Sequence, residues 1–247
     1  MRLINCGCSF AHGFNGTILD DYTPVDQPGL AEVQVKGFQS AGWHLAKKHK
    51  FEYVDLARNG NSNEAILRTL RTYININGSE DMFVLIGWTH AFRREYLSMN
   101  QNTNRAEFIQ YREVPNHESF LSKFQRIEPM FVPFNERNNR PLAYDDHIEF
   151  RQYNIMLAAQ QLLTLFGIPY LMYNACGSEH ESNNTAVTEI KDQVNKQKFF
   201  NFDGLAFNEH LKKKGWNGHP DPNGHMELAE MLSPMFAEIV DKAQEKQ

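Results

Sequence analysis

The segment Met82-Phe83-Val84-Leu85-Ile86-Gly87-Trp88 is the longest apolar stretch of this 247-residue chain. Its short length and its lack of alternation between apolar and polar residues predict a central strand of a parallel sheet, covered on both faces. The stretch is far too short to cross a bilayer, for which a helix needs about 20 residues. We therefore expect an α/β fold built around this strand.

Strand and helix patterns alternate on both sides of this segment. Short strands are expected at residues 2–6, 51–56 and 169–173, and amphipathic helices at 37–50, 61–73, 145–166 and from about 223 onward. This alternation favours a parallel sheet with helices on both faces, because right-handed crossovers bury both sides of each strand. We predict one α/β domain spanning residues 1–247, with an insertion at about 94–144 that lacks sustained periodicity.

Several local signals indicate where these elements begin and end. Asn61, followed by Glu64 three residues later, resembles a capping box at the start of a helix. Gly167 is expected to end the helix that precedes it. The polar segment 176–195 is expected to be rich in loops, and residues 199–202 form either a short last strand or an aromatic plug.

The composition excludes some classes of function. The formal net charge is -5, so the chain lacks the clustered excess of Lys and Arg that nucleic-acid binding needs. Because the N-terminus carries no extended signal-peptide core, we expect a soluble cytoplasmic protein without a membrane partner, or a virion protein if a phage encodes it.

The cysteines predict neither a disulfide framework nor a metal centre. Three cysteines cannot all pair, and we interpret them as buried free thiols in a reducing compartment. Cys6, Cys8 and His12 could suggest a metal site, but a lone CxC without a second ligand pair is weak evidence. We predict no metal and no cofactor.

Candidate site residues follow directly from the expected topology, because ligands of open parallel sheets bind beyond the carboxyl ends of the strands. Three groups of residues directly follow predicted strands: Gly7-Cys8-Ser9, Arg58-Asn59-Gly60 and Gly87-Trp88-Thr89-His90. Ser9 is the candidate nucleophile, although an isolated serine in such a turn is more often a cap. The partners of Ser9 therefore decide its interpretation.

Four blocks of the sequence occur in the order of a known hydrolase family. They are Gly7 to Gly13, the block around Gly60, Gly87 to His90, and His219-Pro220-Asp221-Pro222-Asn223-Gly224-His225. Together they resemble the SGNH hydrolase superfamily, also called GDSL-type esterases and lipases, in versions similar to those of bacteria and bacteriophages. The resemblance implies a three-layer α/β/α sandwich with a central parallel sheet, flavodoxin-like and of the SGNH type.

The resemblance also implies roles for individual residues. Ser9 would be the nucleophile and His219 the general base that takes its proton. The backbone N–H groups of Ser9 and Gly60 would hold the oxyanion. Thr89 occupies the position of the family's asparagine, which normally supplies a third donor, although a threonine hydroxyl donates one hydrogen bond and has a shorter reach.

This sequence departs from the family pattern at the acid as well. Trp216 stands where the family has the aspartate of the triad, three residues before the histidine. Asp203 and Asp221 are candidate replacements, but Asp221 before Pro222 fits a helix N-cap better and Asp203 fits a turn. Asn61 and Asn63 are candidate donors for the oxyanion and equally candidate helix caps.

Other residues are candidates for the walls of the site. Trp88, His90 and Asn61 could line a substrate pocket, although a tryptophan after a core strand is more often simply buried. Arg93 and Arg94 could bind an anionic substrate group, and we favour solvation at the surface for both.

The sequence therefore predicts a serine esterase that hydrolyses an acyl ester, such as an O-acetyl group, of a carbohydrate or small molecule through an acyl-serine intermediate. The alternative is a weakened or inactive SGNH-fold protein with a binding or structural role, for example in a phage particle. Acyl transfer to a sugar is a third hypothesis. The sequence does not determine the oligomeric state.

Overall fold

The computed structural model describes residues 1–12, 39–91, 93–100, 105–112, 144–177, 183–215 and 219–245. Its centre is a five-stranded parallel sheet in the order β2-β1-β3-β6-β7. The strands are β1 (Arg2–Gly7), β2 (Glu52–Asp55), β3 (Met82–Trp88), β6 (Tyr170–Asn174) and β7 (Phe199–Phe200). Every residue of β3 is buried, which confirms the predicted central strand.

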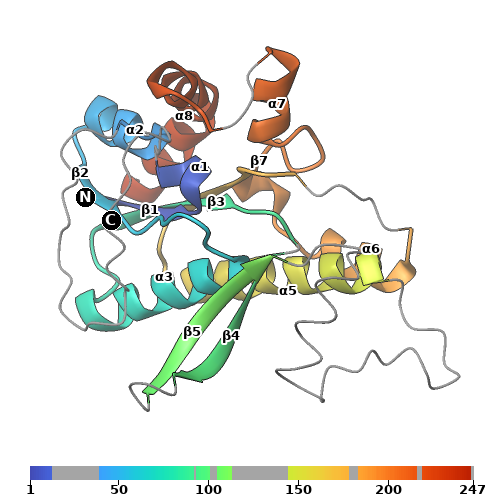
Figure 1. Cartoon of the computed structure of the whole chain (residues 1–247). Coiled ribbons are helices and arrows are strands. Elements are labelled where there is room, and N and C mark those ends of the chain that lie inside the picture. The colour runs from blue at the N-terminus through green and yellow to red at the C-terminus, as the bar shows by residue number, and fades with distance from the viewer. Residues whose placement is uncertain are drawn as a thin grey trace, which may run out of the picture.

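Helices cover both faces of this sheet (Figure 1). On one face lie α2 (Ala41–His49), α7 (Phe207–Lys213) and α8 (Pro222–Gln244), and on the other lie α3 (Asn63–Asn77), α5 (Tyr144–Leu165) and, beside α5, α6 (Thr185–Asp192). The predicted α/β fold with its three layers is therefore confirmed. When the five strands of this sheet are numbered along the chain, their order is 2-1-3-4-5, which is the order of flavodoxin-like sheets.

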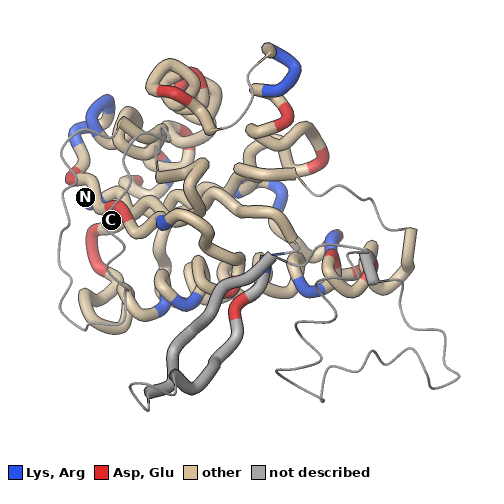
Figure 2. The backbone as a smooth tube through the Cα atoms, viewed as in Figure 1, with Lys and Arg blue, Asp and Glu red and all other residues tan. Residues whose placement is uncertain are grey.

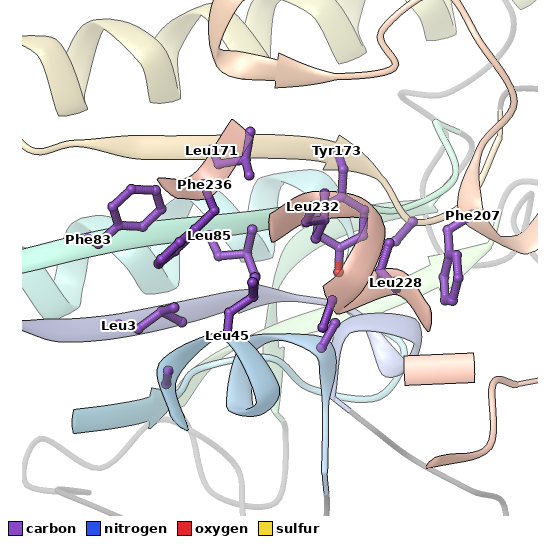
Figure 3. Close-up of a cluster of buried hydrophobic side chains, with 14 of the residues drawn as sticks. Leu3, Leu45, Phe83, Leu85, Leu171, Tyr173, Phe207, Leu228, Leu232 and Phe236 are labelled. Carbon is purple, nitrogen blue, oxygen red and sulfur yellow. The ribbon is translucent and has the colours of Figure 1, made fainter. Parts of the chain in front are cut away.

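Two apolar clusters join the layers, one on each face of the sheet. In the first, shown in Figure 3, Phe83 and Leu85 of β3 point toward Leu232 and Phe236 of α8. The rings of Phe83 and Phe236 are 4.4 Å apart between centroids. Alternate residues of one strand thus serve opposite cores, since neighbouring side chains of a strand point to opposite faces. This is the physical reason why β3 is apolar throughout.

The structure corrects the predicted start of α3. Ser62 is the N-cap, and its Oγ accepts a hydrogen bond of 3.2 Å from Ala65 N. The Asn61 side chain instead donates to the carbonyl oxygen of Gly7. Gly167, by contrast, follows α5 with a φ of +65°, the left-handed conformation expected of a glycine that ends a helix.

Two segments contain more regular structure than their sequences suggested. Helix α6 lies within 176–195, where loops were expected; its N-cap Asn184 accepts a hydrogen bond from Ala186 N. Within the insertion, β4 (Arg93–Asn100) and β5 (Arg105–Arg112) form an antiparallel hairpin that extends away from the main sheet (Figure 1). Residues 113–143 of the insertion lie outside the described part. Of the two alternatives for residues 199–202, a short strand or an aromatic plug, the structure shows the strand, β7. Phe202 packs on Phe199 beside it.

The charges of the described residues are spread over the helices of both faces (Figure 2). Lysines gather in the last turns of α2 and α7, where a cation complements the helix dipole. No helix within the described ranges has the length and apolar character needed to cross a membrane.

Replacing Gly7 by alanine should destabilise the fold by about 1–3 kcal/mol, as overpacking does elsewhere. The added Cβ would lie 2.4 Å from Ala11 Cβ and 2.9 Å from the carbonyl oxygen of Gly87. Chemical denaturation of Gly7→Ala, Ala11→Gly and the double variant measures the coupling between the two positions. Because Ala11 Cβ is the nearest obstacle, the double variant should lose less stability than the two single losses combined, and strict additivity would contradict this geometry.

Candidate active site

The candidate site lies where the direction of strand order reverses in the sheet. The chain runs from β1 outward to β2 and then returns to β3 on the other side of β1. In flavodoxin-like sheets the crevice beyond the carboxyl ends of the first and third strands is the usual ligand site. Ser9 follows β1 after one intervening residue, and Thr89 and His90 directly follow β3. The topology thus brings these blocks to one edge of the sheet.

Ser9 begins a single helical turn, α1 (Ser9–His12), which one residue separates from the end of β1. The Cys8 carbonyl oxygen accepts hydrogen bonds from the backbone N–H groups of Ala11 and His12, at 2.9 and 3.0 Å. The buried Asn5 side chain donates to the Ala11 carbonyl oxygen at 2.9 Å. These bonds fix the turn and hold the Ser9 side chain at the rim of the sheet.

His219 lies beside Ser9 although 210 residues separate them in the chain. The distance between His219 Nε2 and Ser9 Oγ is 2.7 Å, within hydrogen-bond range. The Phe10 ring packs on the His219 imidazole with 4.7 Å between ring centroids. The structure therefore brings together the two residues that the sequence proposed as nucleophile and base.

The surroundings of His219 favour its neutral form. Partial burial lowers the pKa of the His219 imidazole below its ordinary value, and the positive charge of Arg93 lowers it further. A neutral imidazole has one nitrogen free of a proton, which is the state that can accept the proton of a serine. The site therefore keeps His219 in the form that a general base requires.

Gly60 lies in an exposed turn that is tied to the end of β1. Its φ of +80° is in the left-handed region, which suits glycine. The Gly7 carbonyl oxygen accepts a hydrogen bond from Arg58 N at 3.1 Å and another from Asn61 Nδ2 at 3.0 Å. The turn that carries Gly60 is thus held next to the turn that carries Ser9.

Thr89 is fully buried next to the turn that carries Ser9. The residue is 0% exposed, and its hydroxyl lies beside the thiols of Cys8 and Cys176. Asn63 holds its backbone with two hydrogen bonds, accepting from Thr89 N at 3.0 Å and donating to Thr89 O at 3.2 Å. The Thr89 hydroxyl is thus buried beside two thiols, and its expected role as a third oxyanion donor stays a prediction. The side chains of Asn61 and Asn63, the candidate substitutes, both form hydrogen bonds to backbone groups, those of Gly7 and Thr89.

The two candidate acids occupy structural positions. Asp221 is the N-cap of α8, and its Oδ1 accepts a hydrogen bond of 2.8 Å from Gly224 N. Asp203 is exposed and forms ion pairs with Lys191 and Lys196 at 3.2 and 3.3 Å. Trp216, at the family's aspartate position, lies outside the described residues. Each of these two aspartates thus has a structural role in the described part of the chain.

The remaining candidates divide between core and rim. Trp88 is fully buried within the second apolar cluster. His90 is half-buried, and its Nδ1 lies 2.9 Å from the Gly177 carbonyl oxygen. His12 Nδ1 lies 2.7 Å from Asp55 Oδ2, so the structure contains an imidazole–carboxylate pair next to Ser9 that sequence spacing did not reveal.

The three cysteines are buried and free, as the sequence predicted. Burial raises the pKa of the Cys6 and Cys176 thiols, which keeps both protonated at neutral pH. Among the described residues no cluster of three or more His, Cys, Asp or Glu side chains is arranged to hold a metal ion.

Two residues of the site were not assigned to it from the sequence. Phe10 packs on His219, and its place directly after Ser9 was the available signal. Arg93 was interpreted as a surface residue, yet its charge acts on His219. No local pattern distinguishes such an arginine from a solvated one, because its surroundings come from distant segments.

His225, the last residue of the closing block, is buried under the site. It is 1% exposed, and within the described residues neither of its ring nitrogens has a hydrogen-bond partner. Burial, with smaller contributions from the nearby histidines, lowers its pKa to about 4. The folded state therefore holds this imidazole neutral.

This burial predicts a loss of stability in mild acid. Between about pH 6.5 and pH 4 the unfolded chain binds a proton at His225 that the folded chain does not, so stability falls as pH falls through this window. The free energy of unfolding should drop by about 2 kcal/mol between pH 7 and pH 4.5 through this group. Urea denaturation should show that part of the drop disappear in His225→Leu and persist in His147→Leu, an exposed histidine of α5. An unchanged drop in His225→Leu would contradict the assignment.

Comparison with known proteins adds no family to this description. The chain matches no protein-family model, and a search of curated proteins finds no match for it. The functional interpretation therefore depends on the geometry of the site and on the order of the sequence blocks.

Proposed function

We propose that this protein is a serine esterase of the SGNH type, with Ser9 as nucleophile and His219 as general base. The observation that carries the proposal is the 2.7 Å distance between Ser9 Oγ and His219 Nε2 at the reversal point of a flavodoxin-like sheet. A serine is a weak nucleophile until a neighbouring base takes its proton, so this contact is the first requirement of the chemistry. The order of the four sequence blocks supports the same family.

In the proposed reaction Ser9 Oγ attacks the carbonyl carbon of an acyl ester while His219 Nε2 takes the serine proton. The bond to the alcohol then breaks, and His219 returns the proton to the departing oxygen. Water attacks the acyl-serine with His219 again as base and regenerates Ser9. The substrate would be an ester of a carbohydrate or small molecule, such as an O-acetyl ester.

Backbone groups are the candidate oxyanion donors in this proposal. Ser9 is the first residue of a helical turn, where the N–H has no partner within the helix. Gly60 sits in the adjoining turn, held by the bonds to the Gly7 carbonyl oxygen. Donors fixed by the fold need little reorganisation as charge develops on the substrate oxygen. These two backbone groups are therefore the oxyanion donors that we propose.

A binding or structural role is the alternative, and it also has a specific observation in its favour. Thr89 is buried, Asp221 caps a helix and Asp203 pairs with lysines, so three candidates for a catalytic role have contacts that serve the scaffold. A fold can outlast the chemistry it once carried. Turnover of simple esters by this protein would exclude the alternative. A lack of turnover, with the Ser9–His219 contact intact, would support it.

Ser9→Ala should lower kcat/KM for p-nitrophenyl acetate by at least about 10³-fold, the order of loss seen when a catalytic serine is removed. His219→Ala should cause a comparable loss, and the double variant should be little worse than either, because the two residues act as a unit. Ser79→Ala, at the opposite edge of the sheet before β3, is the matched control and should retain full activity.

A serine-reactive phosphonate provides an independent measurement for this proposal. Peptide mass spectrometry should locate the adduct on Ser9 in the wild type and in Ser79→Ala. Equal ester hydrolysis by wild type and Ser9→Ala, together with the absence of an adduct on Ser9, would refute the esterase.

The pH dependence of kcat/KM should follow the neutral form of His219. Because burial and the Arg93 charge lower the pKa of this imidazole, activity should persist below pH 6.5 and fall only at more acidic values. Arg93→Gln removes one cause and should move the acidic midpoint to higher pH. Arg71→Gln, an exposed residue of α3, should leave the midpoint in place. A wild-type midpoint above pH 6.5 would contradict the assignment.

A further inference from the structure

The Arg93 side chain lies close to the Ser9–His219 pair. Arg93 begins β4 five residues after β3 ends, at the reversal point of the sheet. Its positive charge acts on His219 and also on the buried thiols of Cys8 and Cys176, which lie beside the Ser9 turn. The guanidinium is therefore within electrostatic reach of a substrate attached to Ser9.

Two acids, one on β4 and one on α3, are engaged by arginines other than Arg93. Glu95 is engaged by Arg68, whose Nε and Nη2 lie 3.0 and 2.6 Å from its carboxylate oxygens. Glu64 pairs with Arg151 at 3.3 Å. Among the described residues, Arg93 forms no ion pair with either of these two carboxylates.

One donor of Arg93 is buried without a partner. Its Nη1 has no hydrogen-bond acceptor within the described residues, although the atom is shielded from solvent. Leaving a buried donor unsatisfied costs about 1–3 kcal/mol and more when the group is charged. A buried, unpaired guanidinium nitrogen next to a nucleophile is what a site for an anionic ligand presents before the ligand binds.

The backbone around Arg93 is fixed in place. Arg151 Nη2 donates to the carbonyl oxygens of Ala91 and Arg93, and Arg93 N donates to the His90 carbonyl oxygen at 3.2 Å. The Arg68–Glu95 pair anchors the following residues of β4 to α3. A fixed backbone restricts the region that the Arg93 guanidinium can reach, which lowers the entropy lost when it binds a ligand.

We propose that Arg93 forms an anion-binding subsite beside Ser9 and that the ester substrate carries a carboxylate near its scissile acyl group. A planar guanidinium matches a carboxylate in geometry and charge. A singly charged group suits a lone arginine on a chain of net charge -5 better than a doubly charged phosphate does. This inference rests on the proposed esterase, because it takes the molecule that carries the carboxylate to be the ester that Ser9 attacks.

Two aryl esters with the same leaving group test the subsite during turnover. The ratio of kcat/KM for p-nitrophenyl hydrogen succinate to that for p-nitrophenyl acetate measures the preference for a carboxylate. This ratio should fall about 10- to 100-fold in Arg93→Gln, the range expected for a lost charge-assisted hydrogen bond. Arg71→Gln should keep the wild-type ratio. A ratio unchanged in Arg93→Gln would overturn the proposal, even if both rates fell.

A binding measurement separates the subsite from the esterase. Monomethyl succinate and dimethyl succinate are titrated into Ser9→Ala and into Ser9→Ala with Arg93→Gln, and affinity is followed by NMR chemical shifts. Monomethyl succinate should bind Ser9→Ala at least about 10-fold more tightly than the double variant, and the diester should not distinguish the two proteins. Arg93-dependent binding without any esterase activity would refute the proposed function and retain the subsite. Turnover of acetate esters without Arg93-dependent binding would refute the subsite and retain the proposed esterase.

The wild type alone provides a further test if the Arg93 variants do not fold. Sodium chloride should lower kcat/KM for the succinate ester more steeply than for the acetate ester, because salt screens the attraction between the carboxylate and Arg93. Identical salt dependence for the two esters would overturn the subsite.

Discussion

The carbonyl oxygen of Gly7 accepts hydrogen bonds from the Arg58 backbone and from the Asn61 side chain, and the placement of two candidate site turns depends on this pair of bonds. One turn carries Ser9 and the other carries Gly60. Gly7 also lies opposite Gly87 in the sheet, and the absence of a side chain lets Ala11 pack directly above them. The close approach of three chain segments at the reversal point of the sheet therefore fixes the rim before any ligand arrives.

Asparagines provide much of this bracing, because an amide side chain offers a donor and an acceptor as a peptide group does. Asn63 satisfies both backbone groups of Thr89, and Asn208 accepts from Gly177 N at 3.0 Å. In the loops at the carboxyl edge of a parallel sheet, backbone N–H and C=O groups have no partners in a strand ladder or a helix. Such groups are costly when they are buried without a hydrogen bond. Polar residues near the site are thus not all candidates for chemistry, and this chain assigns several of them to the scaffold.

The sequence was sufficient for the parts of the fold that depend on local patterns. The apolar run at 82–88 predicted the central strand, and block order predicted that Ser9 and His219 meet. The N-cap of α3 was misassigned because Asn61 and Ser62 are both good caps, and the choice depends on the distant Gly7 carbonyl oxygen. The β4–β5 hairpin was not predicted because a ribbon that projects from the main sheet need not follow the apolar alternation of a half-buried strand.

Arg93 shows most clearly why the site could not be completed from sequence, since the groups that hold and isolate it come from α3 and α5. Its charge also links substrate recognition to the base. In the free protein the Arg93 charge opposes protonation of His219. During attack by Ser9 the imidazole must become positive, and a neighbouring cation raises the energy of that state. A carboxylate bound to Arg93 would cancel much of this field and stabilise the imidazolium as it forms. Under the proposed chemistry, an acidic substrate would therefore add electrostatic support for the imidazolium, the kind of support that an aspartate gives in a triad.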